Sequence, residues 1–104
     1  MSINIAAKHI EMNDYLKSHI EDKIDHLESK YNVKMIADVH FDKSGNNIKA
    51  KIICNDMERR HKTIVGDAED FDITTSFDNA LEKLDHQLHK VYSKEKSHNY
   101  NKIS

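Results

Sequence analysis

The sequence of 104 residues contains no proline, no tryptophan, two glycines and one cysteine. The single cysteine, Cys54, cannot build an internal disulfide framework, and it fits the reducing environment of a cytoplasm. The glycines, Gly45 and Gly66, lie far apart, which excludes a glycine-rich loop of the kind that holds phosphate groups. The chain also lacks repeats and linkers, so we expect one domain with one modest core.

Long apolar runs are also missing. None approaches the roughly 20 residues that a membrane-spanning helix requires. The start of the chain lacks the basic and then apolar pattern of a secretion signal. These features predict a cytoplasmic protein without a membrane partner.

The sequence offers no recognisable catalytic set. His86 and His89 could lie on adjacent turns of a helix, but no third metal ligand is evident near them. Cys54 falls on the inward side of a predicted strand, which favours a buried structural thiol over an exposed nucleophile. We therefore expect no enzymatic activity, no small-molecule substrate, no cofactor and no metal site.

Charge is abundant but nearly balanced. Charged residues make up 33% of the chain, there are eight histidines, and the net charge is −2 when the histidines are neutral. A negative sum argues against a generic nucleic-acid binder. The local placement of cations matters more than the sum, however, so the pattern along each element is the more informative property.

Two segments have apolar residues three and four positions apart, which predicts amphipathic helices near residues 13–31 and 73–94. Asn13 can cap the first helix, and Asp72 or Thr74 can cap the second. The apolar stripes are Leu16, Ile20, Ile24, Leu27 and Tyr31 in the first helix, and Phe77, Ala80, Leu81, Leu84, Leu88 and Val91 in the second.

Alternating apolar and polar residues predict four strands. The last strand leaves its facing open, because either Ile64 with Lys62 or the set of His61, Thr63 and Val65 could point inward. We expect this strand to end at Gly66. The four predicted strands cover residues 2–7, 33–42, 47–55 and 59–66.

The order β-α-β-β-β-α predicts an α+β fold of two layers. Its four-stranded mixed sheet would have the first two strands parallel and both helices on one face. The other face would be exposed and carry Lys34, His40, Lys49 and Lys51.

This domain would cover residues 1–94. The composition turns polar after Ser93, so residues 95–104 are expected to form a frayed, mobile C-terminal tail.

Both predicted helices sort their charges onto opposite flanks of the apolar stripe. These charges could simply keep the helices solvated, or the basic flanks could contact an anionic partner; the same spacing on both helices gives weight to the second interpretation. The basic flanks are His19, Lys23, His26 and Lys30, and then Lys83, Gln87, Lys90 and Lys94; the acidic flanks are Asp14, Glu21, Asp25 and Glu28, and then Asp78, Glu82 and Asp85.

The start of the second helix resembles a known family signature. The segment DITTSFD at 72–78, with Glu82-Lys83-Leu84, Gln87-Leu88 and Lys90 after it, is similar to that of the short ribosome hibernation-promoting factors and ribosome-associated translation inhibitors, in the sigma-54 modulation protein family. The first strand and the first helix also resemble this family, so the similarity covers residues 2 to about 94.

The resemblance implies a protein that is not an enzyme and has the shape of a double-stranded-RNA-binding domain. It implies binding to the small ribosomal subunit, that is, to 16S-type rRNA and neighbouring ribosomal proteins, in the channel for mRNA and tRNA. Translation would then be inhibited under stress or in stationary phase. Because the chain is too short for the dimerisation domain of the long family form, ribosome pairing would require a separate dimerising factor.

The family binds RNA mainly through basic residues of its two helices. Three positions depart from the family pattern: Thr74 replaces a tyrosine, His86 an arginine and Tyr92 a commonly basic residue. The expected RNA-binding residues are Lys23, Lys30, Lys83, His86, Gln87, Lys90 and Lys94, with His19 and His26 as possible further contacts.

Other functions stay open at this point. The exposed sheet face, with Ile36 and Ile53, could bind a protein, as a sigma-factor modulator would. The chain could also be a generic double-stranded-RNA-binding domain. A metal-binding role through the histidines is the weakest alternative.

Overall fold

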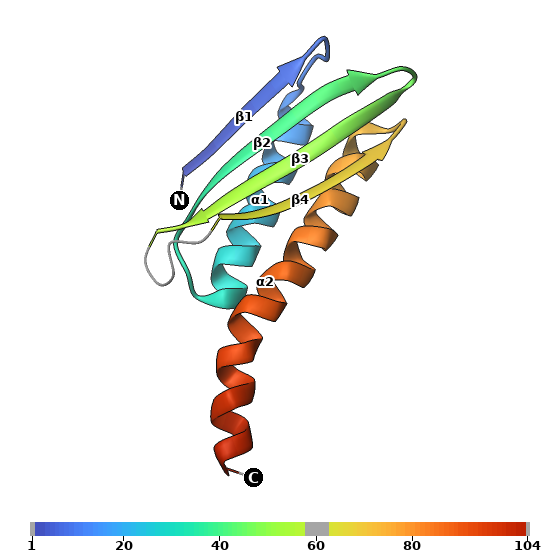
Figure 1. The fold of residues 1–104 in the computed structure, drawn as a ribbon. Helices are drawn as coiled ribbons and strands as arrows, with labels where there is room; N and C mark the ends of the chain where they lie inside the picture. The colour runs from blue at the N-terminus through green and yellow to red at the C-terminus, as the bar shows by residue number, and fades with distance from the viewer. Residues whose placement is uncertain (1, 58–62, 104) are drawn as a thin grey trace.

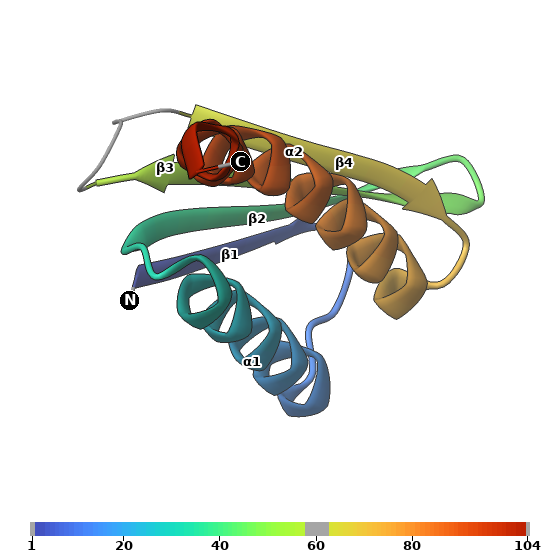
Figure 2. The ribbon, with the colours of Figure 1, turned by 90° about the horizontal axis from the view of Figure 1, so that it is seen from below.

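The computed structural model of the protein describes residues 2–57 and 63–103, the stretch 93–103 by its backbone only. The elements are β1 (Ser2–Lys8), α1 (Asp14–Tyr31), β2 (Met35–Ser44), β3 (Asn47–Asp56), β4 (Thr63–Asp70) and α2 (Ile73–Ile103). The strands form one sheet in the order β1-β2-β3-β4, and both helices cover the same face of it (Figures 1 and 2). The predicted α+β fold is confirmed.

The sheet is mixed, as predicted. β1 runs parallel to β2, with Ile5 beside Val39, and the pairs β2–β3 and β3–β4 are antiparallel. The turn between β2 and β3 contains Gly45 with φ of 60°, a conformation that glycine adopts without steric cost. These pairings mean that strands β1, β2 and β4 point the same way. Both helices begin at the end of the sheet where these strands finish (Figure 1).

The core lies between the sheet and the two helices. It contains every residue of the predicted first stripe except Tyr31, which is half-buried at the core edge. The largest completely buried side chains include Phe41 of β2, Ile52 of β3, and Phe77, Leu84 and Leu88 of α2. Apolar burial of this kind is the main favourable term in folding.

Both helices begin at side-chain caps. The Asn13 side chain accepts a hydrogen bond of 2.7 Å from the Leu16 N–H, and the Asp72 carboxylate accepts one of 2.9 Å from the Thr75 N–H. The bonds from the Thr75 N–H and hydroxyl lower the pKa of Asp72 below its usual value. Of the two candidates for the second cap, Asp72 is therefore the one that acts.

β4 differs from the prediction. It continues through Gly66 to Asp70, because Gly66 serves a close contact with α2 and not a turn. A Cβ atom at Gly66 would lie 2.5 Å from the Ala80 carbonyl oxygen and 2.7 Å from the Leu84 nitrogen. Ile64 is buried and Thr63 is exposed, so that Ile64 is on the side of the strand that faces the core. The predicted strand residues 59–62 lie outside the described residues.

α2 is also longer than predicted. Its backbone is helical to Ile103, and this part of the helix runs past the end of the sheet (Figure 1). The sequence after residue 94 is polar but contains neither proline nor glycine, so it holds no strong helix breaker. The mobility of residues 95–104 stays a prediction. None of the described helices combines the length and the apolar character that crossing a membrane demands.

Candidate nucleic-acid interface

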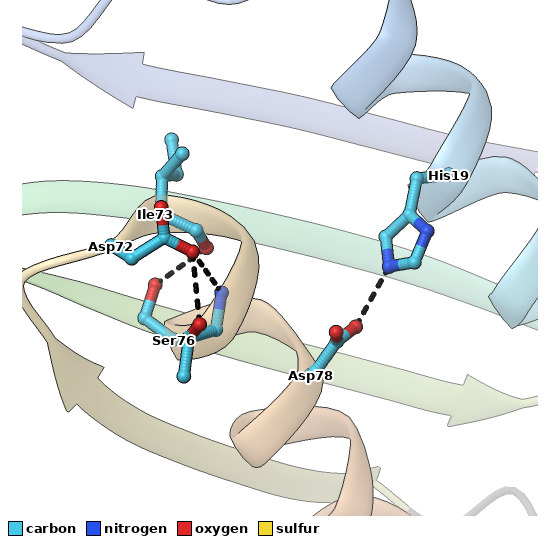
Figure 3. Close-up of polar contacts among 6 residues, drawn as sticks. His19, Asp72, Ile73, Ser76 and Asp78 are labelled. Carbon is cyan, nitrogen blue, oxygen red and sulfur yellow. Dashed lines mark hydrogen bonds and ion pairs between the residues drawn. The ribbon is translucent and has the colours of Figure 1, made fainter.

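The basic flank of α1 faces the acidic flank of α2 across the groove between the helices. His19 Nε2 lies 2.7 Å from Asp78 Oδ1 (Figure 3). Farther along the groove, Lys30 Nζ lies 3.0 Å and 3.2 Å from the two carboxylate oxygens of Asp85. Two residues of the predicted α1 basic flank thus bond to carboxylates of the protein itself. We call these four residues the interhelical seam.

A pocket of about 280 Å³ lies along the same groove, and we call it the seam pocket. Its α1 wall contributes the exposed side chains of Lys23 and His26, and its α2 wall contributes three carboxylates. Lys23 and His26 are therefore accessible to a partner, but only beside negative charge. The pocket is lined by Lys23, His26, Leu27, Asp78, Leu81, Glu82 and Asp85.

Asp85 is held in its charged form. Burial raises its pKa, but hydrogen bonds from the Tyr31 hydroxyl and the Lys30 ammonium outweigh burial and leave the pKa below its usual value. The same contact works in the opposite sense on Tyr31, whose pKa is raised by burial and by Asp85. An ionised Asp85 neutralises Lys30 and fixes the position of its ammonium group.

Lys30 also lines a second pocket of about 280 Å³, at the C-terminal end of α1, which we call the basal pocket. It brings together Lys30, His86 and Lys90 of the predicted RNA-binding set. His89 lies here as well. Two lysines and two histidines thus surround one carboxylate, and an anion would meet the most favourable field of the groove here. The pocket is lined by Lys30, Tyr31, Asp85, His86, His89 and Lys90.

A third pocket, of about 540 Å³, lies on the other flank of α2 beside β4, and we call it the edge pocket. It contains Lys83, His86 and Gln87 of the predicted set, together with the carboxylates of Glu69 and Glu82. The predicted α2 residues thus line two adjacent pockets, and His86 belongs to both. The side chain of Lys94 lies outside the described residues.

Gln87 has a structural contact. Its amide nitrogen donates a hydrogen bond of 2.7 Å to the carbonyl oxygen of Val65, on the outer side of β4. In the described part of the chain, β4 pairs with β3 alone, so this side chain covers part of an exposed sheet edge. One of its two amide hydrogens is therefore engaged within the fold.

Tyr92 is a buried residue at a position where the resembled family commonly has a basic one. It is 3% exposed, and its hydroxyl donates a hydrogen bond to the buried carboxylate of Asp56. Its ring lies 5.7 Å from that of Tyr31. The signal was available in the sequence, because Tyr92 follows Leu84 and Leu88 at steps of four along the apolar stripe.

The exposed face of the sheet is not a surface of unopposed cations. Its register places Lys49 between Asp42 and Glu69, and Lys51 between His40 and Asp67. Opposite charges at directly opposed strand positions attract, so these lysines are locally balanced. Phosphate would meet a weaker field here than at the basal pocket.

The thiol and the possible metal ligands show no reactive arrangement among the described residues. Burial raises the pKa of Cys54 to about 12, so that its thiol stays protonated at neutral pH. Within residues 2–57 and 63–92, no three histidine, cysteine or carboxylate side chains lie close enough to hold one metal ion.

Comparison with known proteins places the chain in a family. The family described as "Sigma 54 modulation protein / S30EA ribosomal protein" matches residues 3–96. The crystal structure of the Protein Y N-terminal domain of Thermus thermophilus has a TM-score of 0.76 and 21% identity, covering 88% of this chain and 99% of that one. The structure of a ribosomal subunit interface protein from Coxiella burnetii has a TM-score of 0.67 and 17% identity, covering 93% of this chain and 99% of that one. No curated protein sequence matches significantly.

Proposed function

The chain belongs to the family of the sigma 54 modulation proteins and S30EA ribosomal proteins, and from this premise we propose that it is a ribosome hibernation factor. In this proposal it binds the small ribosomal subunit in the channel for mRNA and tRNA. It inhibits translation there under stress or in stationary phase. The family consists of ribosome-associated factors and not of enzymes, which agrees with the expectation of no catalytic activity.

The basal pocket is the observation that supports RNA binding best. Lys90 of α2 lies there with His86, His89 and Lys30 of α1, whose ammonium group is paired with Asp85 of the same pocket. Folded RNA presents phosphates and 2′-hydroxyls over wide surfaces while its deep groove hides the base edges. Cations at fixed spacing suit such a target, because phosphate contacts set position and need no base-specific apparatus.

The other predicted contacts have graded roles. Lys23 and His26 reach RNA from the seam pocket, where carboxylates reduce their attraction for phosphate. Lys83 reaches it from the edge pocket. Lys94 stays a predicted contact. His19 contributes least, since it is bonded to Asp78.

The partners are 16S-type rRNA and neighbouring ribosomal proteins. The protein acts in the cytoplasm, where ribosomes lie. Its family description also names sigma 54 modulation, and the half-buried Ile36 and Ile53 on the exposed sheet face are the residues that a protein partner would cover.

Charge reversal tests the proposal. The variant Lys83→Glu/Lys90→Glu should lose co-sedimentation with small subunits in a sucrose gradient, while its thermal stability stays near that of the wild type, because both side chains are exposed. Wild-type binding should also weaken as salt rises, with a log–log slope of about −0.7 to −0.9 for each neutralised phosphate.

The matched control is Lys17→Glu/Lys43→Glu, which changes the net charge equally at exposed positions outside the three pockets. This control should keep most of the binding. Equal loss in both double variants would mean that only net charge matters. Wild-type protein that stays at the top of the gradient would refute ribosome binding and leave sigma-factor modulation as the function to test.

A further inference from the structure

The acidic flank of α2 lies inside the proposed RNA-binding surface, and not on the opposite side of the molecule. Asp78, Glu82 and Asp85 all line the seam pocket, together with Lys23 and His26 of α1. Asp78 and Asp85 also bond directly to His19 and Lys30. Every cation of the α1 basic flank therefore either bonds to an α2 carboxylate or shares a pocket with one.

Resting on the proposed function, we propose that Asp78, Glu82 and Asp85 form a specificity filter that excludes generic RNA from the groove between the helices. The three carboxylates hold the position that phosphates would otherwise take beside the α1 cations. RNA that presents a continuous row of phosphates to the groove meets these carboxylates. RNA that presents its phosphates to the basal pocket meets Lys90 and two histidines beside the Lys30–Asp85 pair, so that one carboxylate and not three faces it.

The range of the effect follows from screening. At physiological salt the field of an exposed charge decays over about 8 Å. The carboxylates therefore act on phosphates that enter the groove and have less effect on phosphates at more distant parts of the surface. Like charges brought together at an interface raise the free energy of the wrong complex, which makes repulsion an efficient source of specificity.

Asp78 and Glu82 are exposed and contribute little to stability, and this makes the filter testable. The side chains of Asp78 and His19 are 47% and 19% exposed, and those of Asp85 and Lys30 are 31% and 45% exposed. Removing the charge of an exposed carboxylate such as Asp78 changes the free energy of unfolding little. Neutral variants at Asp78 and Glu82 should therefore fold, which thermal melting checks directly.

The filter variant is Asp78→Asn/Glu82→Gln, and the control is Glu21→Gln/Asp25→Asn. Both raise the net charge by the same amount, and both change exposed carboxylates spaced four residues apart on one helix. Only the filter variant changes the groove, because Glu21 and Asp25 belong to the opposite flank of α1. Glu82→Gln alone serves as a third variant, since in the described part of the chain Glu82 forms no ion pair.

The probes are an RNA duplex of about 16 base pairs, the length that a double-stranded-RNA-binding domain spans, and purified small ribosomal subunits. We expect the filter variant to bind the duplex about 10-fold tighter than the wild type. Its log–log salt slope should be steeper by about 0.7 to 0.9 for each α1 cation that gains a phosphate. The control should gain no more than about 3-fold, as expected for exposed charges outside the contact surface.

The ratio of subunit affinity to duplex affinity decides the proposal. It should fall in the filter variant and in Glu82→Gln, and it should stay near the wild-type value in the control. Equal duplex gains in filter and control variants would overturn the filter, because net charge alone would then explain them. A wild type that binds no subunits refutes the proposed function, whereas the duplex comparison still decides whether the carboxylates exclude generic RNA.

Discussion

α2 meets the rest of the molecule in two different ways. Against β4 it packs so closely that only glycine fits at position 66, and its buried face there is apolar. Against α1 it keeps a groove with pockets, crossed by the ion pairs His19–Asp78 and Lys30–Asp85. The first side supplies stability through burial and close packing. The second contributes less to stability and carries the charges on which recognition would depend.

The largest expected effect comes from a substitution that disturbs the packing of α2 against β4. Gly66→Ala would place a Cβ atom 2.5 Å from the Ala80 carbonyl oxygen, so the helix backbone must shift. We expect a loss of about 1–3 kcal/mol in the free energy of unfolding, the usual cost of overpacking, measured by urea denaturation. The control is Gly45→Asn, at a turn position with φ of 60° and no atom within 4 Å of the added Cβ. Equal stability of Gly66→Ala and wild type would show that α2 does not sit this closely on β4.

The next largest effect concerns the hydrogen bond between Tyr31 of α1 and Asp85 of α2. Tyr31→Phe removes the hydroxyl that donates to Asp85 while the ring stays beside Tyr92. A hydrogen bond to a charged group contributes about 1.5–3 kcal/mol when buried. Partial exposure reduces this, and we expect a loss of about 1 kcal/mol. Urea denaturation measures it, and a variant as stable as the wild type would show that Asp85 does not depend on this contact.

A smaller effect concerns acid. The folded state lowers the pKa of Asp85 below its ordinary value of 3.8, so its contribution to stability is present above that value. It is lost as the pH falls through the lowered folded pKa. Asp85→Asn should therefore be less stable than the wild type at neutral pH. In acid the difference in stability between the two proteins should become smaller. Thermal melting across this range tests it, and a stability difference that does not change with pH would contradict the prediction.

The smallest effect concerns binding alone. His86 lines both the basal and the edge pocket, where the resembled family commonly has an arginine. Histidine gains its charge only as the solution becomes acidic, whereas arginine stays charged. Wild-type affinity for small subunits should rise from about pH 7.5 to about pH 6. His86→Arg should bind tighter at the higher pH and respond less to acidification. Identical pH profiles would remove His86 from the contact surface.

The elements could be predicted from the sequence because their signals are local. The stripe from Leu16 to Leu27 specifies which face of α1 is buried, whatever lies opposite, and Asn13 caps the helix through a residue three positions away. The charge on each flank of α1 and α2 was predictable for the same reason. The assignment of these flanks to RNA stays a prediction.

β4 and Tyr92 show where local signals end. Gly66 reads as a strand end in the sequence, but the backbone of α2 occupies the space in which a side chain would stand. The steps of four from Leu84 and Leu88 indicate that Tyr92 is buried, but they do not reveal the partner of its hydroxyl, Asp56 of β3, which is remote in the sequence. In both cases the deciding atoms belong to a different element.

The sequence by itself determined the elements, their buried faces and the separation of charge on each helix, because residues a few positions apart settle these properties. Only the tertiary structure decided that the basic flank of α1 faces the acidic flank of α2. That pairing depends on how the two helices are placed and rotated on the sheet, which each helix settles through its own apolar contacts with the strands. The charges follow the helix faces to which they belong, and so cations that seemed available to RNA lie beside carboxylates of the same protein.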